Sequence, residues 1–302
     1  MKYNRRNFIQ AAGVMAAGTL ILPQWACKSG GSQTAVAEGT EAATGGTLKE
    51  FGLQLYTLRD DLPKDPKGIL KQVASFGYKQ IEGYEGPQGL FWNMPHMEFK
   101  AYLDELGMQM ISSHCNFNEN FETKAAQAAE IGMKYLLSPW VGPQKTLDDF
   151  KKIADRFNEC GEICRKNGIR FAYHNHGYSF QELEGQFPQD YMMANTDPAT
   201  VDYEMDIYWV VTGGADPIAY LEKYPNRFRL CHVKDRTKGA PAGEPDASCD
   251  LGTGSIDYAK ILKVAADNGM EYYIVEQEKY ENSTPLKSAE VDAQYLKNLV
   301  FA

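Results

Sequence analysis

The 302-residue chain has the composition of an ordinary globular protein, with 43% hydrophobic and 24% charged residues and a formal net charge of −9. Residues 1–46 hold four basic and two acidic side chains, so the remainder of the chain carries −11. Nucleic-acid sites need a clustered positive field, which so acidic a body does not provide. Nucleic acid is therefore excluded as an expected partner.

An export signal is predicted at the N-terminus. Arg5 and Arg6 precede the weakly apolar run AAGVMAAGTLILP, which falls short of the ~20 apolar residues of a membrane-spanning helix. The arginine pair followed by Phe8 and Ile9 resembles a twin-arginine signal, whose route carries folded proteins. We expect an exported protein that is periplasmic or lipid-anchored to the cell envelope.

Two exit points from this signal compete. Lipidation of Cys27 would attach the protein to a membrane, whereas Ala35-Val36-Ala37 is a conventional small-x-small cleavage site. Residues 28–47 are rich in Gly, Ser, Thr and Ala and predict a flexible tether. The expected division is a signal and linker over 1–47 and one folded domain over 48–302.

From residue 48 onward, helical patterns that end in glycine alternate with short apolar strands. One helix shows the apolar spacing Ile69, Leu70 and Val73. Glycine occupies the expected left-handed C-cap of five helices, at Gly77, Gly107, Gly132, Gly168 and Gly269. The pattern predicts eight strands, at about 51–58, 78–84, 108–115, 134–140, 169–175, 201–207, 228–234 and 271–277.

Strands that alternate with helices imply parallel strands joined by crossovers. Eight such units in the folded part predict an α/β protein with a (β/α)8 TIM barrel, whose usual size is ~250 residues. The rival fold is a doubly wound open sheet. It is disfavoured because no glycine-rich phosphate loop follows the first strand.

Polar residues collect at the carboxyl ends of the predicted strands, where barrel enzymes keep their reactive side chains. They come in pairs two residues apart, so the members of a pair share one face. Four of the five histidines occupy these ends, and His96 is the exception. The pairs are Gln54 and Tyr56, Glu82 and Tyr84, His114 and Asn116, His174 and His176, Glu204 and Asp206, His232 and Lys234, and Glu276 and Glu278.

Four of these residues predict a metal site, because they come from four successive strands and can point at one centre: His174, Asp206, His232 and Glu276. Neutral imidazole with carboxylate suits one divalent ion, namely Mn, Co, Zn, Fe or Mg. No cysteine is aligned with them, which disfavours a structural zinc site. We expect His174 to face the metal and His176, one step further along the same face, to meet the substrate.

These residues, in this order, resemble the xylose isomerase-like barrel superfamily of sugar isomerases and epimerases, over essentially all of 48–302. The segments that carry the resemblance are FGLQLYTLR, YHNH, VDYEMDIYWV, CHVKDR and VEQE. The resemblance implies a divalent ion bound by Glu, Asp, His and Glu at the ends of strands five to eight, as in the ketose 3-epimerases. Asp206, His232 and Glu276 match this set, whereas His174 stands where the epimerases have glutamate.

The resemblance implies an isomerase or epimerase of a non-phosphorylated sugar or keto-sugar, which removes a proton next to a metal-chelated carbonyl. In the epimerases the two glutamates act from opposite faces of the sugar, so His174 removes one of the two carboxylates. Glu276 is then the leading base. A second proton must be moved by Glu82, His114 or Lys234.

Aromatic and polar residues at the strand ends are candidate sugar contacts. This predicted substrate-binding set is Gln54, Tyr84, Trp140, His176 and Trp209.

Two other functions compete with the isomerase. A metal-dependent lyase or dehydratase, acting by β-elimination on a keto-sugar or keto-glycoside, needs one base and one acid, and His174 favours it. Inosose dehydratases belong to the same superfamily. The third hypothesis is a non-catalytic carbohydrate-binding barrel. Apurinic endonuclease activity is not expected, because those enzymes bind several zinc ions through more histidines and need a basic surface. A phosphorylated substrate is not expected either, since no basic cluster or glycine-rich cradle is visible.

Overall fold

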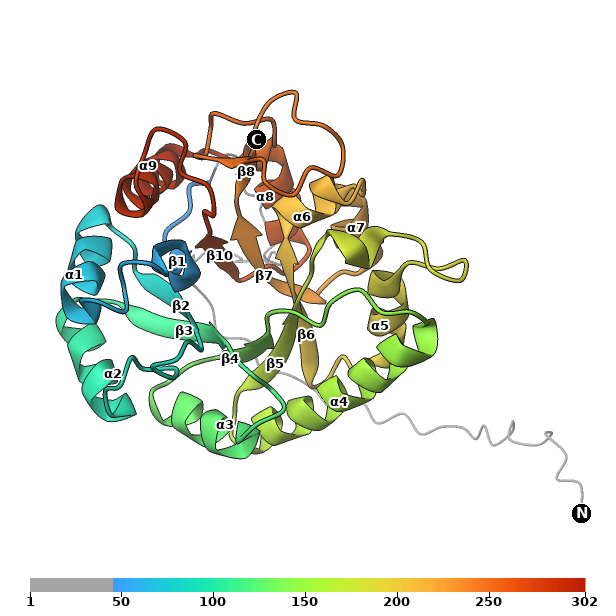
Figure 1. The fold of residues 1–302 in the computed structure, drawn as a ribbon, viewed down its shortest axis with the longest axis horizontal. Helices are drawn as coiled ribbons and strands as arrows, with labels where there is room; N and C mark the ends of the chain where they lie inside the picture. Colours follow the sequence, from blue (N-terminus) through green and yellow to red (C-terminus); the bar gives the residue numbers. More distant parts are fainter. Residues whose placement is uncertain (1–45, 302) are drawn as a thin grey trace, which may run out of the picture. The chain divides into compact units, whose positions relative to one another are not determined.

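The computed structural model describes residues 46–301, so the predicted export signal, both exit points and most of the tether lie outside the described residues. Eight parallel strands close into a barrel in the order β1-β10-β7-β6-β5-β4-β3-β2 (Figure 1). The predicted (β/α)8 barrel is confirmed. The barrel strands are β1 (Gly52–Gln54), β2 (Gln80–Tyr84), β3 (Gln109–His114), β4 (Tyr135–Ser138), β5 (Arg170–His174), β6 (Val201–Asp206), β7 (Phe228–Val233) and β10 (Tyr272–Val275).

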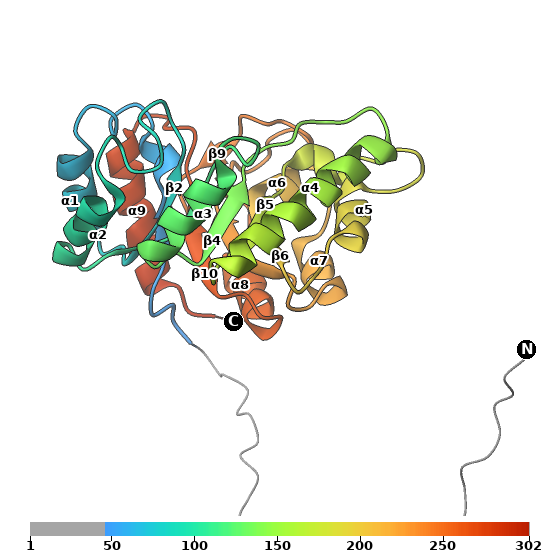
Figure 2. The ribbon, with the colours of Figure 1, turned by 90° about the horizontal axis from the view of Figure 1, so that it is seen from below.

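The helices form an outer ring and run along the outside of the strands (Figure 2). None of the described helices is long and apolar enough to cross a bilayer. A short antiparallel pair, β8 (Asp235–Arg236) with β9 (Ser248–Cys249), lies in the connection after β7. The helices are α1 (Pro66–Phe76), α2 (His96–Glu105), α3 (Phe121–Glu130), α4 (Leu147–Lys166), α5 (Pro188–Asn195), α6 (Ile207–Thr212), α7 (Pro217–Lys223), α8 (Tyr258–Asp267) and α9 (Pro285–Asn298), with 3-10 helices η1 (Leu55–Leu58) and η2 (Gly177–Phe180).

Helix ends follow the signals in the sequence. All five glycines predicted to end helices have φ between 66° and 99°, in the left-handed region that other residues rarely adopt. At the other end of α4, the hydroxyl of Thr146 accepts a hydrogen bond from the backbone N–H of Asp149. These caps set where each helix returns the chain to the barrel.

Strand β1 ends at Gln54, four residues earlier than predicted. The side-chain oxygen of Gln54 accepts a hydrogen bond from the backbone N–H of Tyr56 (2.9 Å) and so starts the 3-10 helix η1. The Tyr280 hydroxyl donates to the carbonyl of Thr57 (2.5 Å) and holds this turn against the segment after β10. Local side-chain hydrogen bonds thus outweigh the strand pattern of this segment.

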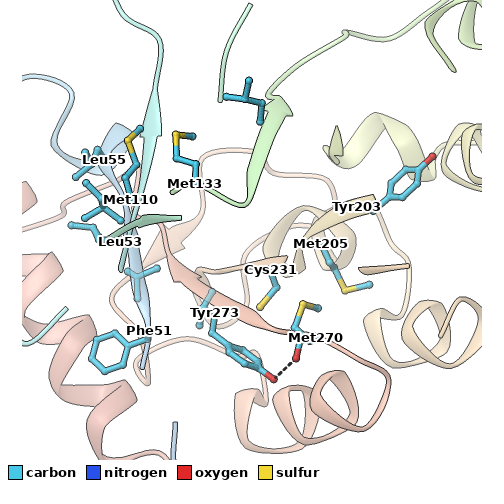
Figure 3. Packing of buried hydrophobic residues seen from close by; sticks show 14 of the residues in the cluster. Phe51, Leu53, Leu55, Met110, Met133, Tyr203, Met205, Cys231, Met270 and Tyr273 are labelled. Atoms are coloured by element: carbon cyan, nitrogen blue, oxygen red, sulfur yellow. Dashed lines mark hydrogen bonds between the residues drawn. The ribbon is translucent and has the colours of Figure 1, made fainter. Parts of the chain in front are cut away.

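Apolar side chains pack on both faces of the barrel strands. The larger layer fills the space between strands and helices, and Figure 3 shows part of it, including Leu53, Met205 and Cys231. The smaller one lies on the opposite face of the strands, inside the barrel, and consists of Ile111, Tyr135, Leu137, Ala172, Leu230 and Ile274. On β5, β7 and β10 a member of this inner layer lies two residues before His174, His232 and Glu276. Because side chains two apart on a strand share a face, each of these polar residues lies directly above an apolar residue of the inner layer.

Close packing of α4 against the start of β6 gives a stability prediction. A Cβ at Gly161 would lie 2.9 Å from Thr200 Cβ and 3.0 Å from Val201 Cγ2. Gly161→Ala should therefore lower the free energy of unfolding by about 1–3 kcal/mol through overpacking, against the ~1 kcal/mol that alanine gains in an open helix. Urea unfolding measures this. The exposed control Lys166→Ala should change stability by less than ~0.5 kcal/mol, and a stabilised Gly161→Ala protein would contradict the packing argument.

Candidate active site

A cavity of about 820 Å³ opens at the carboxyl ends of the barrel strands. Its lining includes seven of the residues that the sequence predicts for the site: Tyr84, His114, Trp140, His174, His176, Trp209 and Glu276. Such a size is typical of a small-molecule site. The ends of separate strands therefore supply one shared chamber, as the barrel fold leads us to expect.

The four side chains predicted to hold a metal converge: His174 and Glu276 line the cavity, and Asp206 and His232 are buried next to them. One potential ligand atom from each of His174, Asp206, His232 and Glu276 lies within 4.8 Å of the others. His174 Nε2 is 3.3 Å from Asp206 Oδ2, and His232 Nδ1 is 3.2 Å from Glu276 Oε2. Strand register produces the match, since Asp206 pairs with His232 across β6 and β7.

Three of the four side chains, His174, Asp206 and His232, are held by a hydrogen bond on the side away from the cluster. His174 Nδ1 is 3.2 Å from the carbonyl of Pro139, so its N–H donates there and Nε2 faces Asp206. Asp206 Oδ1 accepts from the backbone N–H of Trp209 (2.9 Å), which leaves Oδ2 toward the centre. Outer hydrogen bonds of this kind orient the ligands of metal sites.

One ring nitrogen of His232 is anchored and the other faces the carboxylates of the cluster. Its Nε2 lies 2.8 Å from Glu82 Oε1, to which the Nε2–H donates. Its Nδ1 is buried, faces Asp206 and Glu276, and has no hydrogen-bond partner in the part of the chain that the structure describes. Burial opposes a charge on His232, but Glu204 and Glu276 hold its pKa well above the ordinary value, so this nitrogen takes a positive partner: a proton, or a divalent ion in its place. The donor set and its geometry therefore fit a divalent ion.

Lys234 is buried beside the same carboxylates. Its ammonium lies 2.9 Å from Asp206 Oδ2, 2.7 Å from Glu276 Oε2 and 2.8 Å from Glu278 Oε2. Burial opposes ionisation, but Lys234 outweighs it and holds the pKa of Asp206 and of Glu276 well below the usual range. Three carboxylates against one ammonium leave a charge of −2, which matches a divalent cation.

A second ring of titratable groups lies next to the four ligands and shares His232. His114 Nε2 is 2.9 Å from Glu204 Oε2 and 3.3 Å from Glu82 Oε1, and all of these residues are buried. Burial opposes the charged imidazolium, yet Glu82 and Glu204 raise the pKa of His114 to about 9. Burial and the nearby Glu82 raise the pKa of Glu204 to about 7. His114 is therefore a protonated group at neutral pH that also lines the cavity.

The structure revises two predicted roles. Gln54 is fully buried and does not line the cavity, so it is not placed for sugar contact; its amide donates to Glu82 Oε1 (2.8 Å). Glu82 is likewise fully buried, and it supports His114 and His232 instead of facing a substrate. Lys234 does not line the cavity either, but its ammonium touches the carboxylate of Glu276, which does.

Glu204 is the residue that the predicted site set omits. The signal was present in the alternation Glu204-Met205-Asp206, which places the two carboxylates on one face of β6. Its function in the ring depends on His114, which is 90 residues away in the chain. Sequence spacing alone does not reveal that contact.

Aromatic rings build the cavity wall beside His174. The ring of His176 meets Trp140 edge to face at 4.4 Å and lies 5.3 Å from Trp209. Burial and the neighbouring His174 hold the pKa of His176 well below its ordinary value, so its imidazole is neutral. Its buried Nδ1 has no hydrogen-bond partner among residues 46–301, which suits a contact with a substrate hydroxyl.

The fold and this cluster define an enzyme of the TIM-barrel class, with its polar site at the carboxyl ends of the strands. The family described as the xylose isomerase-like TIM barrel matches residues 70–299, and the chain belongs to this family. This confirms the resemblance that the strand-end residues carry.

Curated relatives are named as dehydratases. Inosose dehydratase of Clostridium botulinum is 29% identical over 168 residues, which cover 50% of this chain and 54% of that protein. Inosose dehydratase of Lactiplantibacillus plantarum is 25% identical over 257 residues, covering 74% of this chain and 85% of that protein. The chain thus spans about half the length of the clostridial dehydratases that it matches.

Solved structures share the fold. A sugar phosphate isomerase/epimerase from Parabacteroides distasonis is 29% identical, with a TM-score of 0.72 over 85% of this chain and 96% of that one. The IolI protein, solved with a bound zinc atom, has a TM-score of 0.66 at 16% identity, over 81% of this chain and 95% of that one. At that identity the second likeness concerns the fold alone.

The neutral His176 gives a pH prediction. Its pKa is lowered in the folded state, so below about pH 6.5 the unfolded chain takes up a proton that the folded chain does not, and stability falls as pH falls. His176→Gln lacks this contribution. Its stability should decline less between pH 7 and pH 5, by up to about 1.4 kcal/mol per pH unit. Urea unfolding at several pH values tests this, and parallel pH profiles for the two proteins would contradict it.

Proposed function

We propose that the chain is a divalent-metal-dependent lyase that acts by β-elimination on a keto-sugar or keto-glycoside without a phosphate group. The observation that carries the proposal is that one carboxylate beside an ammonium (Glu276 next to Lys234, 2.7 Å) and one imidazole between two carboxylates (His114 next to Glu204 and Glu82) line a single cavity. Elimination needs one base and one acid. The dehydratase names of the curated relatives support the same reaction class.

The residues take distinct roles in this reaction. A divalent ion held by His174, Asp206, His232 and Glu276 would polarise the substrate carbonyl as a Lewis acid. Glu276, kept ionised by the ammonium of Lys234, takes the proton from the carbon next to the carbonyl. The electron pair forms a carbon–carbon double bond as the β-carbon–oxygen bond breaks. His114 gives its proton to the departing oxygen, and Glu82 and Glu204 hold the imidazole in place.

An isomerase or epimerase is the second candidate, and the name of the Parabacteroides distasonis protein favours it. It requires a proton to be returned to carbon. His174 stands where an opposed carboxylate would, and its Nδ1–H donates to Pro139, so it offers no free base. The elimination therefore ranks first. A carbohydrate-binding protein without activity ranks third, because it does not explain the buried ion-pair cluster.

The location is also a proposal. The twin-arginine-like N-terminus supports an exported, periplasmic or lipid-anchored protein, where free sugars and glycosides are the available carbohydrates.

Products formed in deuterated water separate the two leading reactions. We expect an unsaturated product, or one with a cleaved glycosidic bond, when the protein is incubated with a panel of keto-sugars and keto-glycosides and examined by NMR. Solvent deuterium at a retained stereocentre, with no loss of oxygen, would establish isomerisation instead.

Loss of the proposed base gives a quantitative prediction. Glu276→Gln keeps the side-chain shape but removes the charge, so turnover should fall about 10²- to 10⁴-fold. The matched control Glu271→Gln changes an exposed carboxylate paired with Arg229 and should keep turnover. A Glu276→Gln protein with full activity would remove the base from the mechanism.

Removal of the metal should have two readouts. Dialysis against a chelator should abolish turnover and also lower the melting temperature, because an ion bound to the folded state stabilises it. Asp206→Asn should reduce the number of divalent ions bound per chain, measured by elemental analysis. A wild-type protein that binds no divalent ion would contradict the metal site.

A further inference from the structure

The cavity extends beyond the strand ends that hold the proposed metal ligands. We call its distant part the outer arm. It is lined by residues after β3 and β4 and on the second and third turns of α4, namely Asn116, Phe117, Trp140, Val141, Ile153 and Arg156. The whole cavity of 820 Å³ has room for about 27 water molecules at ~30 Å³ each, whereas a hexose has about 12 non-hydrogen atoms. One sugar ring therefore leaves much of the cavity unfilled.

His114 joins the reacting end to the outer arm. It ends strand β3, and its ring lies 5.1 Å from that of His174 on the side of the metal ligands. The chain continues from His114 directly into the wall of the arm at Asn116 and Phe117. An oxygen that takes its proton from His114 thus lies at the entrance to the arm.

The charged groups around the outer arm are already paired. Arg156 contacts Glu159 at 2.9 Å and donates to the carbonyl of Phe117 at 2.6 Å. Lys152, which also lines the cavity, is 2.9 Å from Asp148. Each of these cations is already neutralised by a neighbouring carboxylate, so the arm offers no excess positive charge to a phosphate or carboxylate and suits a neutral ligand.

The indole ring of Trp140 forms an exposed apolar surface in the outer arm. Its side chain is 53% exposed, although His176 and Tyr178 meet its ring edge to face at 4.4 and 4.9 Å. The loop that carries it is pinned, since the Val141 N–H donates to the Tyr178 hydroxyl (3.3 Å). A large exposed aromatic ring held in one orientation is typical of a ligand contact.

We propose that the outer arm is a second binding subsite, which holds the leaving unit of a glycoside: a neutral second ring joined through oxygen to the ring that reacts at Glu276. The assignment of this second ring as the leaving group rests on the proposed elimination. When the β-carbon–oxygen bond breaks and His114 protonates that oxygen, the second ring departs as a neutral alcohol into the arm. A sugar ring and an aryl ring share the flat apolar face that Trp140 recognises.

Calorimetric titration of the full-length, metal-loaded protein tests this subsite without turnover. Methyl β-D-glucoside carries one ring, cellobiose two sugar rings, and phenyl β-D-glucoside one sugar and one aryl ring. At least one two-ring ligand should bind 10-fold or more tightly than the one-ring ligand. Tighter binding of cellobiose identifies a sugar unit, and tighter binding of the phenyl glucoside identifies an aryl unit.

Two variants act on the arm in opposite ways. Trp140→Ala removes the indole surface and Ile153→Trp fills the space, so either should abolish the preference for two rings, and Ile153→Trp should spare binding of the one-ring ligand. Phe187→Ala, an exposed aromatic outside the cavity lining, should keep the preference. The subsite is refuted if no two-ring ligand binds more tightly than the one-ring ligand, or if both arm variants bind as the wild type does.

Failure of this inference differs from failure of the proposed reaction. A two-ring preference without elimination of any keto-glycoside would keep the subsite and remove the lyase. Elimination from a single-ring keto-sugar, together with equal binding of one and two rings, would keep the lyase and remove the subsite.

Discussion

The burial of the Lys234 ammonium among three carboxylates is the interaction on which the mouth of this barrel depends. Without a positively charged partner, buried carboxylates such as Asp206 and Glu276 would take up protons, because burial disfavours the charged form. The ammonium keeps both ionised, but one positive charge does not balance three negative charges. The remainder is what a divalent cation, with two neutral imidazoles, would neutralise. The balance of charge around Lys234 therefore determines both the stability of this cluster and the ionisation of Glu276, the proposed base.

The orientation of the site comes from contacts outside it. Pro139 fixes the tautomer of His174, and Glu82 fixes that of His232, so each presents one free nitrogen toward the carboxylates. Glu82 and Glu204 also keep the imidazole of His114, which lines the cavity, protonated. A barrel can hold such a network because strands from its whole circumference face one interior. The apolar layer beneath excludes water from the cluster and strengthens its ion pairs.

Reaction and specificity divide between different parts of the fold. The residues proposed to react or to hold the ion lie on β3, β5, β6 and β7 and directly after β10, where backbone hydrogen bonding of the strands on both sides keeps them rigid. The outer arm is built from loops and from α4, which can vary without disturbing the barrel. One chemistry can thus serve different substrates within a family. The paired charges around the arm, and the indole of Trp140, give this chain a wall suited to neutral rings.

The sequence by itself determined the barrel and the four converging side chains proposed as ligands, because both depend on short-range periodicity. Glycine C-caps fixed the helix ends, and alternation along β6 placed Asp206 on the inner face. The hydrogen bonds that turn Gln54 and Tyr56 out of the strand, the contact of His114 with Glu204, and the paired state of Arg156 join residues through side-chain geometry. Only the tertiary structure decided these, since the closure of the barrel brings distant residues together. The tertiary structure also decides that Glu82 is buried and that Trp140 is exposed, which the residue types do not specify.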